Sequence, residues 1–457
     1  MKKYSCIGLF IILCSGLSLH AQTKKWTLKE CVDYALQHNI SIKQSELDAE
    51  AAAIDKKDAF GSFIPTVNAN ASHSWNIGLT QTISGLFQNQ TTQYTSAGLN
   101  AGVDIFKGLQ NQNRLRRSKL SIIAAQYQLS KMRDDISLNV ANAYLQILFN
   151  KENLKVQKEQ QSNNEKQQTR TQELVNAGSV PRGDLLDMQA TVASNKQAVV
   201  IAENTLLISK LSLAQLLQFD DFQNFDVADA DYEVKESETM LQTPSAIYEK
   251  AKEQRSELKI ARTNLEIAEK DVRIARGAYY PTLQGFYSFS TRASNSDRIV
   301  TDPDNPTLPA TVRGPLPIID QFSDNKGHSF GFQLNIPILN GFSVKNNVER
   351  SKISMERSKI AYSQQELDLE RNVYTAFTDA NGALNSYEAA SSALEARTEA
   401  YNYAKEKFAV GLMNAFDLNQ AQTLFVNAQS EVLRTKYDYI FRVKVVEFYF
   451  GIPIIQN

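Results

Sequence analysis

The feature that most constrains this chain is a run of 68 residues, Leu109 to Asn176, that contains neither glycine nor proline. A strand-like stretch ending at Phe106-Lys107-Gly108 precedes it, and the turn-forming sequence Gly178-Ser179-Val180-Pro181 follows it. Because each helical residue advances the chain by about 1.5 Å, continuous helix over this run reaches roughly 100 Å. That length is several times the diameter of an ordinary domain.

A second run of the same kind, Phe342 to Val410, lacks proline and is followed by Gly411. Many residues recur 233 positions later in the chain, which predicts a tandem duplication. We place the first repeat at 22–243 and the second at 244–457. The matching pairs are Gly108 and Gly341, Arg117-Ser118-Lys119 and Arg350-Ser351-Lys352, Gly178 and Gly411, Asp184 and Asp417, and Gln189 and Gln422.

The first 21 residues are typical of a secretory signal peptide. Met1-Lys2-Lys3 gives a basic head, Ile7–Leu19 an apolar core, and Ala21 a small residue before the cut. Leu13 precedes Cys14, which disfavours lipidation there, and the apolar core is too short for a retained anchor. No later stretch approaches 18 consecutive apolar residues, so we expect no transmembrane helix. An exported chain of this kind is soluble or crosses a membrane as strands.

Charge and cysteine content exclude several classes of function. Without the signal peptide the formal charge moves from −1 to −3, which argues against a nucleic-acid partner. Cys31 is then the single cysteine, so no intramolecular disulfide can form. His38, His73 and His328 lack metal-ligand spacing. We find no nucleophile–histidine–acid arrangement, phosphate loop or paired carboxylates, and predict neither an enzyme nor a cofactor or metal site.

Two stretches in each repeat alternate apolar and uncharged polar residues with the period of a strand. In the first repeat the apolar positions are Val67, Ala69, Ala71, His73, Trp75 and Ile77, then Ala97, Leu99, Ala101, Val103 and Ile105. In the second they are Leu283, Tyr287 and Phe289, then Phe330, Phe332, Leu334, Ile336 and Ile338. We predict β-hairpins at 64–106 and 280–340, with loops at Gly78–Tyr94 and Thr291–Gly327.

Helices complete each repeat. We expect a first helix from the capping box of Thr27 and Glu30 to about Ala59, and its counterpart from Pro244 to about Arg276. Long helices follow at 109–177 and 342–410, and we expect the second to bend at Asn381-Gly382, near its middle. Returning helices follow at 183–217 and 414–450. The acidic stretch 219–243 joins the repeats.

Strands of this length can cross a bilayer obliquely. A spanning sheet cannot leave an edge unpaired, and four strands cannot close, so the barrel would be shared between chains. Two copies give eight strands and three give twelve. An eight-stranded barrel has little room for a wet, polar lumen, which favours three. The alternatives are a half-buried hairpin of a soluble sandwich for the strands and an ordinary two-stranded coiled coil for the helices.

The opening pattern Leu28-x-x-Cys31-Val32-x-x-Ala35-Leu36-x-x-Asn39 resembles the TolC-like outer-membrane efflux proteins. So do the strand starts Pro65-Thr66 and Pro281-Thr282, and the turn Val410-Gly411 with Asp417-Leu418 and Ala421-Gln422. The resemblance covers the chain beyond the signal peptide.

This resemblance implies an α+β membrane protein of the bacterial outer membrane with a large periplasmic portion. A homotrimer would form a 12-stranded transmembrane β-barrel in the lipid, continued by a long α-helical coiled-coil barrel. The function implied is a passive exit duct for small molecules or polypeptides, served by a periplasmic adaptor protein and an inner-membrane transporter. The rival is a periplasmic coiled-coil adaptor or scaffold without spanning strands. The substrate stays open among drugs, metal ions, siderophores and polypeptides.

The resemblance also implies site residues. In the family, acidic side chains after the second turn ring the periplasmic mouth, and Asp417 occupies that place, with Asp184 as its first-repeat counterpart. Gln420 stands where some members carry a second acid, and Met413 where others carry an arginine that locks the mouth. The adaptor would dock on the turns, at Gly178, Ser179 and Val180 and at Gly411, Leu412 and Met413.

Overall fold

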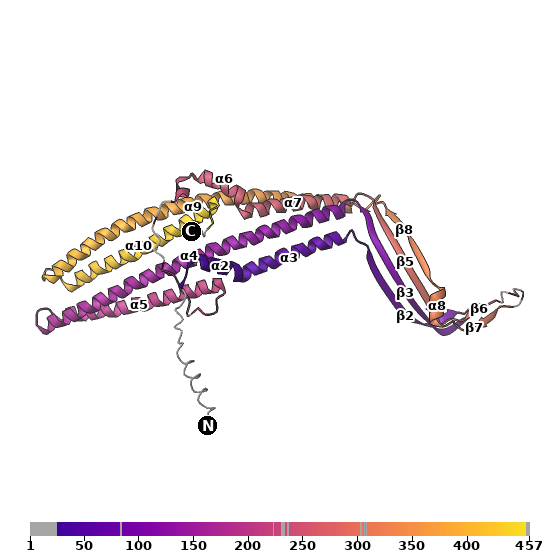
Figure 1. Cartoon of the computed structure of the whole chain (residues 1–457), viewed down its shortest axis with the longest axis horizontal. Helices are drawn as coiled ribbons and strands as arrows, with labels where there is room; N and C mark the ends of the chain where they lie inside the picture. The colour runs from indigo at the N-terminus through magenta and orange to yellow at the C-terminus, as the bar shows by residue number, and fades with distance from the viewer. Residues whose placement is uncertain are drawn as a thin grey trace, which may run out of the picture. The chain divides into compact units, whose positions relative to one another are not determined.

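The computed structural model describes residues 25–82, 85–222, 224–229, 234, 237–301, 304–305, 307 and 309–453. The predicted signal peptide, 1–21, lies outside the described residues, as do parts of the 219–243 linker and of the 291–327 stretch. The chain divides into two units: one holds 1–48, 126–260 and 363–457, and the other holds 49–125 and 261–362. Figure 1 labels most of the elements of both.

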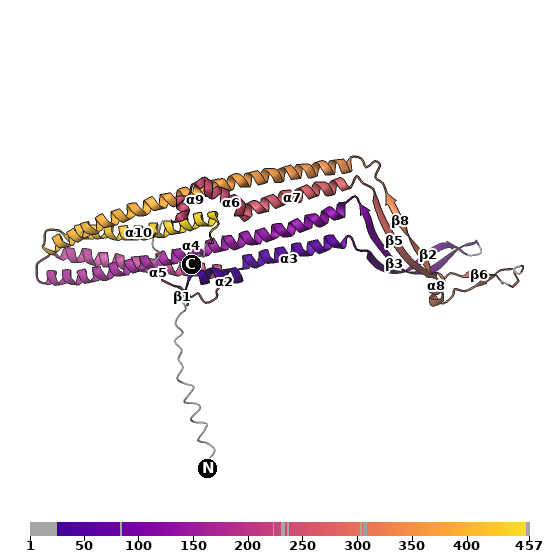
Figure 2. The same ribbon diagram turned by 45° about the horizontal axis from the view of Figure 1, so that its top comes forward.

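The unit of 49–125 and 261–362 contains an antiparallel sheet with the strand order β2-β3-β5-β8. The strands are β2 (Thr66–Gln81), β3 (Phe87–Lys107), β5 (Thr282–Ser294) and β8 (Gly327–Asn335). All four meet helices at the same end of the sheet, as Figure 2 shows. Helices α3 (Ile40–Gly61) and α7 (Ser256–Gly277) lead into β2 and β5, and β3 and β8 lead into α4 (Gln110–Asn176) and α9 (Ser343–Ala409).

The loop predicted at Gly78–Tyr94 is wrong. Strands β2 and β3 pair without interruption from Thr66 opposite Gly102 to Gln81 opposite Phe87. The Gln- and Thr-rich composition suggested a loop, but threonine is β-branched and suits a strand, while uncharged polar residues can fill one sheet face. The connection therefore shrinks to the few residues between Gln81 and Phe87.

The loop predicted at Thr291–Gly327 also contains regular structure. Strand β5 continues to Ser294, and β6 (Arg298–Val300) pairs with β7 (Thr311–Arg313). A short helix, α8 (Ile318–Asp324), precedes β8. Strand β8 ends at Asn335 rather than at Ile338, because Pro337 has no N–H to donate to a ladder.

Two helical hairpins dominate the other unit. Helix α4 returns through α5 (Arg182–Leu217), and α9 returns through α10 (Ala415–Phe450). The main core of this unit gathers apolar residues of α2 (Leu28–His38), α4, α5, α10 and the linker. It includes Cys31, Val32, Tyr144, Ile147, Leu213, Leu217, Phe225 and Ile440.

Each predicted first helix is in fact two helices. The break between α2 and α3 falls at Asn39 (ψ 129°), and that between α6 (Pro244–Gln254) and α7 falls at Arg255 (ψ 130°). Asn39 Nδ2 donates to Leu216 O at 2.9 Å, and its Oδ1 accepts from the Ser41 N–H. The buried Arg255 pairs with Glu257, and its guanidinium lies 3.7 Å from the Phe448 ring centre. Tertiary partners set these breaks, so no glycine or proline marked them.

Helix α9 continues through Asn381-Gly382 as one helix from Ser343 to Ala409, and the bend predicted there stays a prediction. A single glycine costs a helix about 1 kcal/mol relative to alanine, which packing outweighs here. Ala380 and Ala383 beside it are buried.

At the ends of the helices, left-handed backbone occurs in pairs that are 233 positions apart. Gly108 and Gly341 both have φ 57°, Leu109 and Phe342 have φ 58° and 66°, and Gly178 and Gly411 have φ 70° and 74°. Gln218 and Gly451, after the returning helices, have φ 57° and 93°. The ends of equivalent helices therefore share one backbone conformation.

Among the described residues, α5 is long and apolar enough to cross a membrane by length and composition, whereas we expected no such helix. The expectation counted consecutive apolar residues, while α5 mixes apolar residues with isolated polar ones. Helices that pack against other protein surfaces meet the same criterion. Leu186, Val200 and Leu207 of α5 are more than half exposed in the single chain and recur at multiples of seven, the interval of a coiled-coil seam.

Candidate channel site: a two-faced sheet and two helical turns

One face of the four-stranded sheet carries apolar side chains. The register sets Leu99 opposite Phe289, and Tyr287 opposite both Ala101 and Phe330, so these residues share a face. Phe330 is 81% exposed in the single chain. The same face carries the exposed Val67, Trp75, Ile77, Leu79, Ile105, Phe332 and Leu334. Such an apolar surface calls for lipid or protein to cover it.

The opposite face is polar, and its side chains bond across the strands. Asn100 Nδ2 donates to Asn70 Oδ1 at 3.0 Å, and Ser288 Oγ donates to Asn100 Oδ1 at 2.8 Å. Ser72 and Ser96 hydroxyls lie 2.7 Å apart on the next pair of positions. Rows of uncharged amides and hydroxyls suit contact with water.

Strands β2 and β8 are the two edges of the sheet within the chain. They are separated by two antiparallel partners and therefore run in opposite directions. The β8 edge of one copy can thus pair antiparallel with the β2 edge of another.

The two turns predicted as docking tips have one geometry. At the first, the Gly178 N–H donates to Val175 O at 3.0 Å and the Ser179 N–H to Leu174 O at 2.9 Å. At the second, the Gly411 N–H donates to Phe408 O and the Leu412 N–H to Lys407 O. This is the Schellman ending of a helix, which requires left-handed backbone and so favours glycine. Gly178, Ser179, Gly411 and Leu412 are exposed, whereas Val180 and Met413 are half-buried.

The predicted gate residues follow these turns. Asn414 caps α10 by accepting the Asp417 N–H at 2.8 Å, which leaves the exposed Asp417 side chain free of the cap. Asp184 is half-buried in the first turn of α5, where Pro181 provides no side-chain cap. Asn419 Nδ2 donates to Thr191 Oγ1 at 3.3 Å, so the starts of α5 and α10 lie together. Gln420 is exposed one turn from the start of α10.

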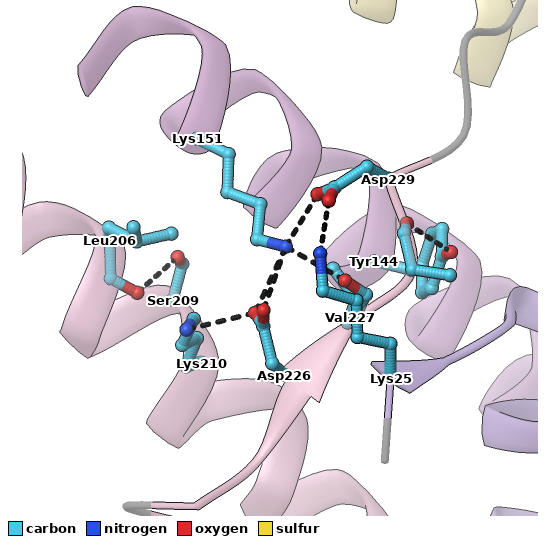
Figure 3. A network of polar contacts seen from close by, with 10 residues as sticks. Lys25, Tyr144, Lys151, Leu206, Ser209, Lys210, Asp226, Val227 and Asp229 are labelled. Carbon is cyan, nitrogen blue, oxygen red and sulfur yellow. Dashed lines mark hydrogen bonds and ion pairs between the residues drawn. The ribbon is translucent and has the colours of Figure 1, made fainter. Parts of the chain in front are cut away.

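Sequence reasoning missed a polar network that holds the N-terminal strand. Strand β1 (Lys25–Trp26) pairs parallel with β4 (Asp226–Val227), and Figure 3 shows Lys151 between Asp226 and Asp229. Lys151 Nζ lies 3.0 Å from Asp226 and 2.7 Å from Asp229, and donates to Val227 O at 2.7 Å. Lys210 adds an ion pair to Asp226 at 2.9 Å.

The repeat contained a signal for this network. The positions 233 residues after Lys151 and Lys210 are Leu384 and Val443, which are apolar. Val443 and Leu384 pack in a hydrophobic cluster with Met240 of the linker. A charged residue whose counterpart in the other repeat is apolar indicates that it has a partner found in its own repeat alone.

We expect Lys151→Met to destabilise the pairing of β1 with β4 by about 2 kcal/mol, because Asp226 and Asp229 would each lose an ion pair and the Val227 carbonyl would lose a hydrogen bond. Hydrogen exchange of the strand amides measures this effect. Lys158→Met is the matched control, since the Lys158–Glu203 pair is about half exposed and contributes about 0–1 kcal/mol. Equal exchange in the two variants would contradict the role given to Lys151.

The same network predicts acid sensitivity. Hydrogen bonds from Lys151 and Lys25 lower the pKa of Asp229. Burial raises the pKa of Asp226, but hydrogen bonds from Lys210 and Lys151 outweigh it and the pKa is lowered. A lowered folded-state pKa contributes stability above the ordinary carboxyl pKa, near about 3.9, that is lost as pH falls through the folded value. The protection factor of the strand amides, which corrects for the slower intrinsic exchange in acid, should therefore fall on acidification, and less so in Lys151→Met.

Within the parts of the chain that the structure describes, no group of three or more His, Cys, Asp or Glu side chains could hold a metal ion.

Comparison with known proteins gives one consistent result. The family model described as "Outer membrane efflux protein" matches residues 31–217 and 247–443. Outer membrane protein TolC of Escherichia coli is 23% identical over 447 residues, covering 96% of this chain and 84% of the relative. Pyoverdine export outer membrane protein OpmQ of Pseudomonas aeruginosa is 23% identical over 360 residues, covering 76% and 68%.

Solved structures show the same fold. The CmeC outer membrane channel of Campylobacter jejuni superposes with a TM-score of 0.76 at 20% identity, covering 94% of this chain and 87% of CmeC. The open state of the MtrE outer membrane channel of Neisseria gonorrhoeae gives 0.71 at 18% identity, covering 93% and 89%.

Proposed function

The chain belongs to the outer membrane efflux protein family, and from this premise we propose that three copies of it build one continuous duct through the outer membrane. The protein lies in the bacterial outer membrane and is an exit duct of an efflux system. The trimer, its twelve-stranded barrel, the gate and the docking partners are the proposal.

The two-faced sheet with two unpaired edges carries this proposal. Its apolar face suits lipid and its polar face suits a water-filled lumen, but four strands cannot close. In hydrocarbon each orphan backbone group costs several kcal/mol, so the edges of β2 and β8 need partners. Pairing β8 with β2 of the next copy supplies them, and three copies give a lumen that eight strands would leave too narrow.

Exposed apolar stripes on the helices support contact between copies. On α3, Ile40, Leu47 and Ile54 recur every seven residues and are all more than half exposed in the single chain. On α9, Ile353, Ile360 and Leu367 do the same. A seven-residue apolar interval is typical of a coiled-coil seam. Helix α3 leads into β2, and α9 follows β8. If β8 of one copy pairs with β2 of the next, the apolar stripe of α9 in the first copy would therefore pack against the stripe of α3 in the second.

We infer that the turns at Gly178 and Gly411 dock a periplasmic adaptor that leads to an inner-membrane transporter. Their exposed, uncharged residues support this role. The cargo is a small molecule or a polypeptide. The name of OpmQ, which refers to pyoverdine export, supports small molecules of the siderophore class. A periplasmic adaptor or scaffold, the rival function, would leave the apolar sheet face without a purpose.

Native mass and conductance test the proposal together. In detergent, the purified protein should have the mass of three chains. When added to a planar bilayer, it should conduct ions. A cysteine on the outer edge of β2 should crosslink to one on β8 only between chains. Monomers that do not conduct, or a crosslink within one chain, would contradict the shared barrel.

The gate gives a further prediction. In a trimer Asp417 would occur three times around the mouth, where each pair of carboxylates repels by a few kcal/mol at an effective dielectric constant of about 20. Cations relieve this repulsion. We expect Asp417→Ala to lower cation selectivity and block by a trivalent cation in bilayer recordings, and Gln420→Asp to raise both.

Asp184→Ala is the matched control for the gate. An acid in the first turn of α5 also complements the helix dipole, so its removal should change selectivity less. Wild-type selectivity and block in Asp417→Ala would mean that Asp417 faces away from the pore.

A further inference from the structure

Helix α8 lies on the apolar face of the sheet, at the end of β5 that is distant from the helices. Thr291 shares that face with Phe289, since both occupy alternate positions of β5. The buried Thr291 donates its hydroxyl to Phe322 O of α8 at 2.8 Å. Ala293, two residues further on the same face, is also buried. Figure 1 shows α8 beside this end of the sheet.

Side-chain hydrogen bonds fix α8 to the strand. Gln321 Oε1 accepts the Ser294 N–H at 2.8 Å, and Gln321 Nε2 donates to Ser294 O at 2.8 Å and to Leu316 O at 2.7 Å. Asn325 Nδ2 donates to Arg292 O at 2.8 Å. A helix of seven residues does not persist alone in water, so these bonds decide both its existence and its place.

The helix has an apolar side that the described residues cover only at Phe322, which is half-buried. At about 100° per residue, Ile318, Ile319 and Phe322 fall within one sector, and Asp320 and Asp324 fall on the other side. Ile318 is 54% exposed and Ile319 is 77% exposed.

The height of α8 along the sheet matches the edge of a membrane. Thr291 lies nine residues after Thr282, where β5 begins. At about 3.3 Å per residue and a tilt of about 40°, nine residues rise roughly 23 Å, and the apolar band of an outer-membrane barrel is about 25 Å tall. Trp75, 61% exposed on the same face, lies nine residues into β2. Tryptophan prefers this boundary between lipid and water.

We propose that α8 is a membrane-surface helix, and that Ile318 and Ile319 insert among lipid acyl chains at the outward-facing interface of the outer membrane. This inference rests on the proposed spanning barrel. The apolar side of α8 continues the apolar face of β5, and Asp320 and Asp324 remain in water and headgroups, as in other interfacial helices. A neighbouring copy would join at the β8 edge, whereas α8 is bonded to β5, one strand inside that edge.

Such a helix would set the depth of the barrel. In β2 the apolar face extends beyond the apolar band of the membrane, because Ile77 and Leu79 follow Trp75. The strands alone can therefore shift along the membrane normal at small cost in free energy. A helix that lies in the interface opposes movement in both directions.

Fluorescence quenching in lipid vesicles tests the position of α8. Single cysteines at Ile319, Asp320 and Phe330 carry a small fluorophore in a Cys31→Ala background, Cys6 and Cys14 being within the predicted signal peptide. The trimer is placed in phosphatidylcholine vesicles whose acyl chains carry a nitroxide near the headgroup or at mid-chain. We expect the label at 319 to lose most of its fluorescence to the shallow nitroxide and the label at 330 to the deep one. The label at 320 should respond to aqueous iodide instead.

The labels separate the failure of this inference from failure of the barrel. If 330 is quenched by lipid but 319 responds only to iodide, α8 faces water and the inference is wrong while the barrel stands. If 319 is shielded from both quenchers, protein covers it, and the inference is again wrong. If 330 is not quenched by either nitroxide, the sheet does not span and the proposed function fails with it.

Discussion

The change Phe330→Arg should remove the protein from the outer membrane, while Ser329→Arg, one residue earlier on the same strand, should leave it there. Phe330 pairs with Tyr287, five residues into β5, which places it near the middle of the apolar face. An arginine on the lipid face at mid-membrane costs about 2–4 kcal/mol. A trimer would pay this three times, so the assembled barrel would lose roughly 6–12 kcal/mol, comparable to the whole stability of many domains.

The two residues make a sharp comparison because they differ only in the face that they occupy. Ser329 pairs with Ser288 on the polar face, where water solvates an added guanidinium. Adding Leu99→Arg to Phe330→Arg, with Asn100→Arg and Ser329→Arg as the control pair, extends the test to β3. Membrane fractionation and heat-modifiable trimers on gels are the measurements. Equal loss in both pairs would mean that the sheet is buried in protein, and equal retention would mean that it does not face lipid.

Changing the two helical turns should strongly reduce export while the trimer stays assembled. Leu412 is 77% exposed beside Gly411, and its backbone is not held in the left-handed region. A partner that binds the turn would remove water from a carboxylate at this position, which would weaken binding. We expect Leu412→Asp combined with Ser179→Asp to reduce export at least about tenfold, which corresponds to only about 1.4 kcal/mol of lost docking.

Asparagine substitutions separate docking from backbone strain. Gly178 and Gly411 have φ 70° and 74°, and a Cβ at either position meets no atom within 4 Å. Asparagine tolerates this conformation better than other residues, so Gly178→Asn with Gly411→Asn keeps the turns and enlarges the surface only slightly. This variant should export at near the normal rate. Normal export in the Leu412→Asp and Ser179→Asp variant, with trimers present, would remove the docking role from the turns.

The sequence was informative wherever local chemistry decides the structure. Helix α4 was expected at 109–177 and runs from 110 to 176, and α10 was expected at 414–450 and runs from 415 to 450, because glycine marks three of these four ends. Strand alternation likewise gave the face of Leu99 and Phe330 correctly. Local chemistry could not give the breaks at Asn39 and Arg255, which depend on partners far along the chain.

Polar composition misled the strand assignment where both faces of a strand are polar. Thr91, Gln93 and Tyr94 belong to a ladder that their neighbours across the hairpin define. Helix α8 was missed for a related reason: it is too short to show periodicity, and its Gln321 and its cap Asn325 hold it by hydrogen bonds to the backbone of β5, about 30 residues away in the sequence. Helix capping explains the positions of Asp417 and Gly411 within their turn. Where they would lie in an assembled pore depends on contacts with other copies of the chain, which the sequence of one chain does not specify.

The pairing of β1 with β4 sets an order of events during biogenesis. Lys25 and Trp26 are among the first residues of the chain to reach the periplasm after the predicted cleavage site, yet their partners, Asp226 and Val227, follow about 200 residues later. Contacts between residues so distant form slowly, because the intervening chain must first close a long loop. During that interval the amphipathic β2 and β3 have emerged while β5 and β8 have not. We therefore expect the first hairpin to remain without its β5 partner until the second repeat arrives, and the N-terminal strand to join the fold late rather than to nucleate it.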